Sequence, residues 1–136
     1  MQFLKNKINS FFLFSIIFLA FSCTSELKFE EVVDYTQPFK ITMLHKNERT
    51  MLGEKTEYSI EPGSEQYIRL TKWLRDNDKG WKKTIAMYDN RSVISQKNFE
   101  INYMGYFVSV IFTDKSGHSY HYSKTVDVGA LDFLFD

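Results

Sequence analysis

The chain has few of the residues that build metal and redox sites. Its 136 residues include one cysteine and three histidines. A single cysteine forms no disulfide within the chain, so packing must supply the stability of the fold. His118 and His121 are three apart on an expected strand and so point to opposite faces, whereas a metal-binding pair on a strand needs a spacing of two. His45 falls in a separate polar loop. We therefore expect solvated histidines and no metal site.

Glycine is also scarce, and its six residues are scattered along the chain. This distribution leaves no glycine-rich loop to hold a phosphate group. No serine stands in a nucleophile elbow. The one carboxylate cluster is typical of a solvated face; it comprises Glu26, Glu30, Glu31 and Asp34. We therefore expect no cofactor and no enzymatic activity, with an enzyme of unrecognised site as an alternative.

Long runs of like charge are absent, because no run exceeds two residues. The chain has 17 basic and 17 acidic residues, and Lys5 and Lys7 are the only charged residues before Cys23, so the remainder is slightly acidic. A protein with this balance has no basic stripe along which a phosphate backbone could bind. Nucleic acid is therefore excluded as the expected partner.

Long apolar runs are limited to one segment near the N-terminus. Residues 11–21 are apolar except for Ser15, and they follow Lys5 and Lys7. A membrane-spanning helix needs roughly 18 or more apolar residues, and this segment is shorter. A positive start, a short apolar middle and small residues at the exit are typical of a secretory signal peptide. We expect residues 1–22 to be removed by a cut after Ser22, with a retained transmembrane anchor as the alternative.

The only cysteine follows this segment directly, in the order Leu19-Ala20-Phe21-Ser22-Cys23. The arrangement resembles the lipobox of bacterial lipoproteins, in which signal peptidase II cuts before a lipidated cysteine. Leu19 lies one place earlier than in the usual pattern, and Phe21 stands where a small residue is usual, while Ser22 fits. The resemblance implies a diacylglyceryl group on the Cys23 thiol and, in many bacteria, a fatty acyl chain such as palmitate on its amino group.

The same residues allow a second outcome. An ordinary signal peptidase cutting after Ser22 would leave a soluble secreted protein with an unmodified Cys23. An unpaired thiol in an oxidising compartment is a liability, and lipidation gives it a use. We therefore favour attachment to a membrane of the bacterial cell envelope, facing the periplasm. Thr24 follows Cys23; in lipoproteins of enteric bacteria an Asp there favours the inner membrane, so the outer membrane is preferred.

The rest of the chain predicts a lipidated N-terminus and spacer over residues 23–37 and one globular domain over 38–136. A helix is expected over about 64–79, because Ser64 is a good N-cap. Tyr67, Leu70 and Leu74 then recur at helical spacing. Gly80 is the expected end of this helix.

Strands are predicted on both sides of this helix, by alternating residues at 39–43, 99–103 and 118–124 and by a continuous apolar run at 106–113. Tight turns are expected at 104–105 and 114–117, and turn residues also occupy 89–92. The tail, 126–135, fits a last strand or a short helix. The predicted fold class is therefore α+β, an antiparallel meander of about four to six strands with one helix packed on a face. The segments with strand patterns are 39–44, 50–60, 84–88, 93–95, 99–103, 106–113 and 118–124.

Four tyrosines near the expected hairpins are candidates for an exposed aromatic patch that binds a glycan or a protein; the alternative places half of them in the core. They are Tyr103, Tyr106, Tyr120 and Tyr122. The expected function is a lipid-anchored, non-catalytic binding module of the envelope. One specific version is an immunity-type lipoprotein that binds a toxin protein. The alternative is a structural or assembly lipoprotein.

Overall fold

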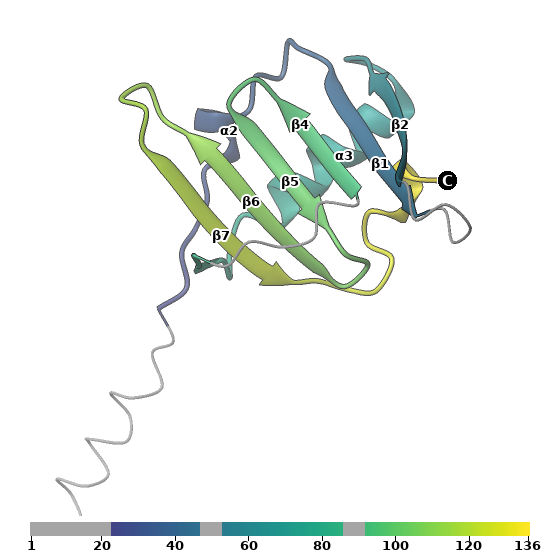
Figure 1. Cartoon of the computed structure of the whole chain (residues 1–136). Coiled ribbons are helices and arrows are strands. Elements are labelled where there is room, and N and C mark those ends of the chain that lie inside the picture. Colours follow the sequence, from purple (N-terminus) through teal and green to yellow (C-terminus); the bar gives the residue numbers. More distant parts are fainter. Residues whose placement is uncertain (1–22, 47–52, 86–91) are drawn as a thin grey trace, which may run out of the picture.

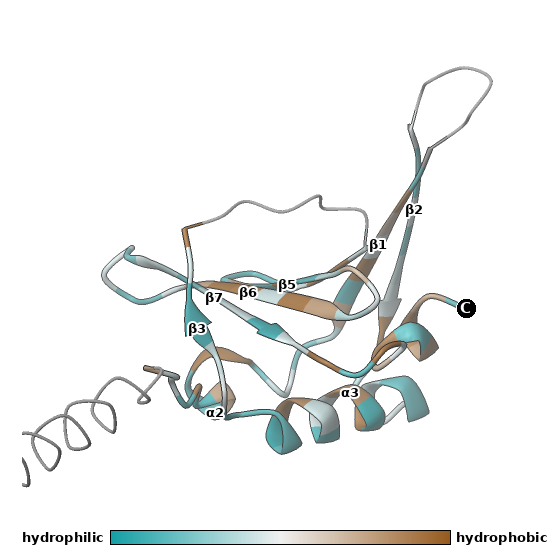
Figure 2. Ribbon diagram, turned by 90° about the horizontal axis from the view of Figure 1, so that it is seen from below, coloured by the Kyte–Doolittle hydropathy of each residue, from teal (hydrophilic) through white to brown (hydrophobic). Residues whose placement is uncertain are grey.

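The computed structural model describes residues 23–46, 53–85 and 92–136. Within these ranges an antiparallel sheet of seven strands carries its helices on one face (Figures 1 and 2). The α+β class is thus confirmed, and the expected number of four to six strands is too low.

Neighbouring strands in this sheet are mostly neighbours in sequence. The last four strands follow one another as a meander, and the first two form a hairpin beside it. The chain then crosses from one edge of the sheet to the other through the long helix, so a two-residue strand closes the far edge. The order across the sheet is β2 (Gly53–Ile60), β1 (Phe39–Lys46), β4 (Ser92–Gln96), β5 (Phe99–Tyr103), β6 (Phe107–Thr113), β7 (Ser119–Thr125) and β3 (Lys82–Lys83).

The long helix, α3 (Glu65–Asp76), begins where the sequence predicts. The Ser64 hydroxyl accepts a hydrogen bond from the Tyr67 amide at 3.3 Å. Tyr67, Leu70 and Leu74 are buried against the sheet, as their spacing requires. The helix is shorter than the predicted 64–79, and Gly80 is not its end.

The early end of α3 has a physical cause in the residues that follow it. Asn77 is the C-cap, and its side-chain amide donates to the Trp73 carbonyl at 3.0 Å. The indole N–H of Trp81 donates to the Asn77 carbonyl at 2.6 Å. These bonds satisfy the last turn and direct the chain toward β3. Gly80, with φ of +82°, is used in that connection instead.

Removing the N-cap of α3 tests its contribution to stability. Ser64→Ala leaves the Tyr67 amide without its side-chain partner, so the free energy of unfolding should fall by about 1 kcal/mol. Ser64→Asp retains a capping oxygen and should stay close to the wild type. Urea denaturation of the three proteins measures the difference, and equal stability of the Ala and Asp variants would rule out the cap as its source.

The core lies between the sheet and the helices. Strand pairing places Ile41, Ile94, Ile101 and Val110 side by side in one row across four strands, and all four are fully buried. Phe99, two residues before Ile101 in β5 and on the same face, is also buried. The apolar residues that alternate along β5, Phe99, Ile101 and Tyr103, are thus all buried. Gly105, with φ of +76°, supplies the tight turn expected between β5 and β6.

The segment expected to be a spacer, 23–37, belongs to the fold from Ser25 onward. Ser25 and Trp81 exchange two backbone hydrogen bonds, of 2.6 and 3.2 Å. Leu27 and Val33 are buried, and Phe29 is 1% exposed at the start of a short helix, α2 (Phe29–Val32).

The aromatic contacts of Phe29 explain why this segment is held. Its ring packs edge-on against Trp81 and Phe99, with centroids 5.8 and 6.0 Å apart. The sequence does not predict this packing, because acidic residues alternate with the buried residues Leu27, Phe29 and Val33. The first contact of this segment with the rest of the fold is that of Ser25 with Trp81, so only Cys23 and Thr24 of the expected spacer precede it.

Two other expectations concern shorter elements. The strand predicted over 84–88 is wrong where it can be compared, because β3 ends at Lys83 and neither Thr84 nor Ile85 is in a strand. Residues 86–91, which carry the rest of that strand and most of the turn predicted at 89–92, lie outside the described residues. In the tail, Asp132–Leu134 forms a short 3-10 helix, which is one of the two forms expected.

Candidate functional site

The sheet face opposite the helices is a candidate binding surface. In Figure 2 both α2 and α3 lie on the same side of the sheet. Strand pairing aligns one residue from each strand across the other face, and most of these side chains are polar. The row, from β2 to β3, is Glu57, Thr42, Val93, Asn102, Ser109, Ser123 and Lys82.

A second row runs beside the first and has the same character. It joins Ser59, Lys40, Ser95, Glu100, Ile111 and His121. We call these two rows the polar face. Its exposed hydroxyl and charged groups, which include Lys40, Glu57, Ser59 and Lys82, can exchange hydrogen bonds with a polar surface, whereas Asn102 and Ser109 at its centre are buried.

The centre of the polar face contains an unmatched acceptor. Asn102 is 2% exposed, and its side-chain N–H donates to Glu100 Oε1 at 2.9 Å. Its Oδ1 has no hydrogen-bond partner among the described residues. A buried acceptor without a partner carries a desolvation cost that a donor would remove. Because Asn102 Oδ1 is itself shielded from solvent, it is a cost within the sheet and is not open to a partner.

The β2 end of the polar face contains an ionised carboxylate, Glu57, between two lysines. Glu57 accepts from Lys40 at 2.8 Å and from Lys55 at 2.5 Å. These two hydrogen bonds, first that of Lys40 and then that of Lys55, lower the pKa of Glu57 to about 2. The carboxylate therefore stays ionised at any physiological pH, within a cluster that carries one net positive charge.

The four candidate tyrosines do not form one patch. Tyr103 is 4% exposed and lies opposite Val108, whereas Tyr120 lies opposite Phe112. Because a strand rises about 3.4 Å per residue, these positions are about 14 Å apart along β6. Tyr106 is 60% exposed in the turn before β6.

Tyr120 and Tyr122 are the two candidates that the structure brings together. Both are partly buried and stack on Phe112, with ring centroids 5.2 and 6.1 Å apart. The three rings lie on the helix side of the sheet. Tyr122 pairs with Val110 of the core row, and Phe112 and Tyr120 are two residues further along their strands, on the same face. They form a cluster of three stacked rings that contains two of the four tyrosines of the expected patch.

Tyr103 instead has a structural role with a measurable pH dependence. Its hydroxyl donates to Asp132 Oδ1 at 2.7 Å, which ties the tail to β5. Burial, and then the hydrogen bond to Asp132, raise the pKa of Tyr103 to about 12. The folded-state pKa lies above the ordinary value of 10, so the neutral phenol contributes stability below pH 10. That contribution is lost as the pH rises toward 12.

Replacing Tyr103 by Phe should therefore flatten the alkaline limb of the stability curve. The free energy of unfolding of Tyr103→Phe should fall less steeply between pH 10 and 12 than that of the wild type, although the variant is less stable at pH 7. Urea denaturation at intervals across this range measures both slopes. Parallel slopes would show that the phenol is not held neutral by the fold.

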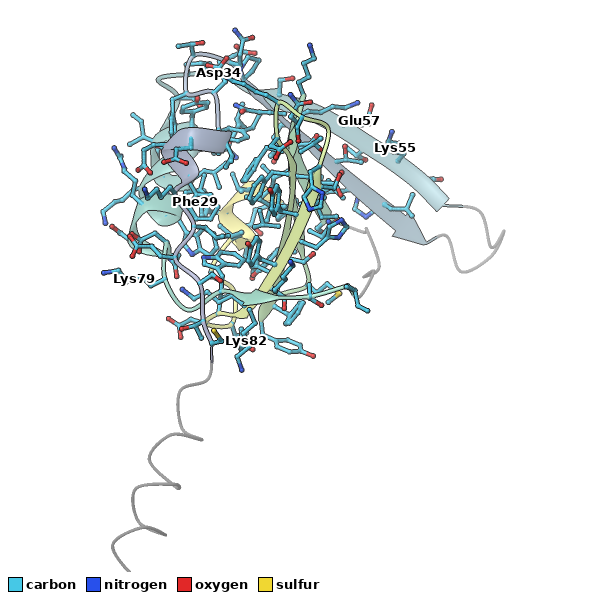
Figure 3. The ribbon with its side chains drawn as sticks, turned by 90° about the vertical axis from the view of Figure 1, so that its left-hand side faces the viewer. Phe29, Asp34, Lys55, Glu57, Lys79 and Lys82 are labelled. Atoms are coloured by element: carbon cyan, nitrogen blue, oxygen red, sulfur yellow. The ribbon has the colours of Figure 1, made fainter. Side chains whose placement is uncertain are left out.

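The predicted attachment residue, Cys23, is exposed and lies immediately before the fold. Thr24 alone separates it from Ser25, whose backbone is bonded to Trp81. Trp81 is fully buried, so its backbone is a fixed point of the domain. Figure 3 shows the start of the described chain beside Lys82, with Glu57 and Lys55 far from it.

Other site types have no support in the ranges that the structure describes. No group of three His, Cys, Asp or Glu residues there could hold a metal ion. No helix in those ranges is long and apolar enough to cross a membrane. The predicted cut after Ser22 lies at the boundary of the described residues.

Comparison with protein-family models, with curated proteins and with solved structures gives no match for this chain.

Proposed function

We propose that the protein is a lipoprotein of the bacterial cell envelope, anchored through Cys23, and that its domain is a non-catalytic binding module. The support for the anchor is the coincidence of the only cysteine with the end of a signal-like segment. Its exposure, immediately before the first hydrogen bonds of the fold, agrees with a role outside the core. Acyl chains on this residue would hold the domain at the membrane surface.

The observation that carries the binding role is the polar face. It spans all seven strands on the side away from α2 and α3. Asn102 and Ser109 are buried at its centre, so the groups open to a partner lie toward its two ends and include Lys40, Glu57 and Lys82. A partner with a polar surface, such as a protein of the envelope or a toxin that the module neutralises, matches this surface in chemistry. The outer membrane is the preferred location where the organism has two membranes.

Mass spectrometry of the N-terminal peptide from isolated membranes tests the anchor. We expect residues 1–22 to be absent and Cys23 to carry acyl chains. An unmodified N-terminal cysteine would instead indicate a soluble secreted protein, and an intact N-terminus would indicate a retained membrane anchor. Either result would overturn the proposal.

A matched pair of variants tests the binding role. Ser95→Arg places a large charged group on the polar face, whereas Ser116→Arg places it in the exposed turn between β6 and β7. A partner cross-linked to the wild type in the envelope should be lost from the first variant and kept by the second. Equal cross-linking in both would exclude the polar face. Cross-links only between copies of this chain would favour the structural or assembly role.

A further inference from the structure

We propose that the end of the domain next to Cys23 rests on anionic phospholipid headgroups of the membrane that carries the anchor. This end comprises Lys79, Lys82, Lys83 and Lys124, which we call the lysine end. The sheet would then stand with β3 at the membrane and β2 away from it. The inference rests on the proposed attachment through Cys23 and adds an orientation and a lipid preference to it.

The tether between Cys23 and the fold is short. An extended chain spans at most about 3.6 Å per residue, so the Cα atoms of Cys23 and Ser25 are at most about 7 Å apart. Ser25 is fixed to Trp81, and Trp81 directly precedes β3. The Ser25–Trp81 pair adds about 5.5 Å and the step to Lys82 about 3.8 Å. An acylated Cys23 therefore keeps β3 within about 16 Å of its Cα atom, which is about two screening lengths at physiological ionic strength.

The lysine end is positively charged. Lys79, Lys82 and Lys83 are exposed. The ammonium of Lys124 is held by the Lys79 carbonyl at 2.8 Å and by Asn77 Oδ1 at 3.1 Å. The acidic residues in the neighbouring segments 25–28 and 77–83 are Glu26 and Asp78. Basic groups therefore predominate where the tether holds the domain, although the chain as a whole has no net charge.

The surface of the lysine end is also hollowed. A shallow groove of about 410 Å³ opens beside β3 and β7, and its walls carry two of the four lysines. Ammonium and hydroxyl groups are suitable donors for a phosphate. Ile85 is 96% exposed two residues after Lys83, which places an apolar side chain next to the basic ones. The groove is lined by Gly80, Lys82, Phe107, Ser123, Lys124 and Thr125.

Lysines on β3 have a second possible use, because a charged edge strand discourages pairing with another sheet. That role needs no lipid and gives no dependence on lipid charge. The two roles are therefore separated by comparing anionic with zwitterionic membranes.

The test uses the chain from Cys23 to Asp136, which contains every contact of the fold described above. Its only cysteine is coupled to a maleimide lipid in vesicles of phosphatidylcholine, with or without phosphatidylglycerol. Limiting acetylation of lysines, read residue by residue by mass spectrometry, reports which end faces the membrane. Coupling in this way does not depend on acylation in cells, so failure of the anchor and failure of the orientation are distinguishable.

On vesicles that contain phosphatidylglycerol, acetylation of Lys82 and Lys83 should fall about fivefold relative to Lys40 and Lys55 of the β1–β2 hairpin. On phosphatidylcholine alone the ratio should stay near that of the free protein. Protection of equal size on both vesicles would reflect crowding by the tether and would overturn the role of headgroup charge. Equal acetylation at the two ends would overturn the orientation.

A variant confirms that the lysines act together. Lys82→Gln with Lys83→Gln changes two exposed side chains and should leave the circular dichroism spectrum unchanged. Protection of Lys79 on the anionic vesicles should then return toward its value on phosphatidylcholine. Full protection of Lys79 in this variant would show that the pair does not bind the headgroups.

Discussion

Replacing Cys23 by serine should move the protein from the membrane fraction to the soluble fraction of the envelope. Serine keeps the size and polarity of the position but offers no sulfur for the diacylglyceryl group. Each methylene buried in a bilayer contributes about 0.8 kcal/mol, so losing two or three acyl chains removes nearly all of the membrane affinity. Fractionation of cells followed by immunoblotting measures the distribution.

Thr24→Ser is the matched control for this experiment. It changes the neighbouring residue, which is also exposed, and leaves the sulfur in place. This variant should remain in the membrane fraction. If Cys23→Ser also remained there, the domain would be held by a retained N-terminal segment or by a membrane partner, and acylation would not be its anchor.

Replacing Phe29 by alanine should lower the free energy of unfolding by about 3–5 kcal/mol, the usual cost of removing a buried aromatic ring. Phe29 is 1% exposed and contacts the rings of Trp81 and Phe99. Its loss leaves a cavity between the N-terminal segment, the connection after α3 and the start of β5. Urea denaturation followed by tryptophan fluorescence measures the effect, because Trp81 lines the cavity.

Glu30→Ala is the control for Phe29. Glu30 is the next residue and is exposed, so its change should alter stability by less than about 0.5 kcal/mol. If both variants were equally stable, residues 25–33 would behave as the spacer that the sequence suggests rather than as part of the core.

The elements that the sequence predicts well are those whose information is local. Helix α3 has a capping serine and an apolar stripe within one stretch. Strands β5 and β7 alternate, β6 is a continuous apolar run typical of a central strand, and the three are separated by turns that contain Gly105 and Gly117. In these regions side-chain period and turn chemistry favour the same structure, so tertiary contacts only reinforce them.

The elements that it misses depend on distant partners. Lys82 and Lys83 have no strand pattern, and they are extended only because β7 offers Ser123 and Tyr122 for pairing. Likewise Phe29 is surrounded by acidic residues in sequence, and its burial requires a site formed by Trp81 and Phe99. No local pattern encodes contacts over such separations.

The candidate site shows the same division. Asn102 and Ser109 lie between apolar residues of their strands, so alternation alone places them on the face away from the core. The polar face can therefore be predicted from the sequence. The aromatic patch cannot, because strand alternation assigns Tyr103 and Tyr120 to one face but does not say how far the core extends along it. The position of the tail helix and its Asp132 determines that Tyr103 is buried.

Cys23 lies only six residues before the buried Phe29, and this separation bears on the order of processing and folding in a lipoprotein. Enzymes that acylate the cysteine and remove the leader need the flanking residues in an extended, accessible form. Residues 25–29 reach that form only while they are detached from Trp81 and Phe99. If Cys23 is acylated as we propose, completion of the core would wait for release from the processing enzymes, and a chain stalled at that stage would leave Trp81 exposed.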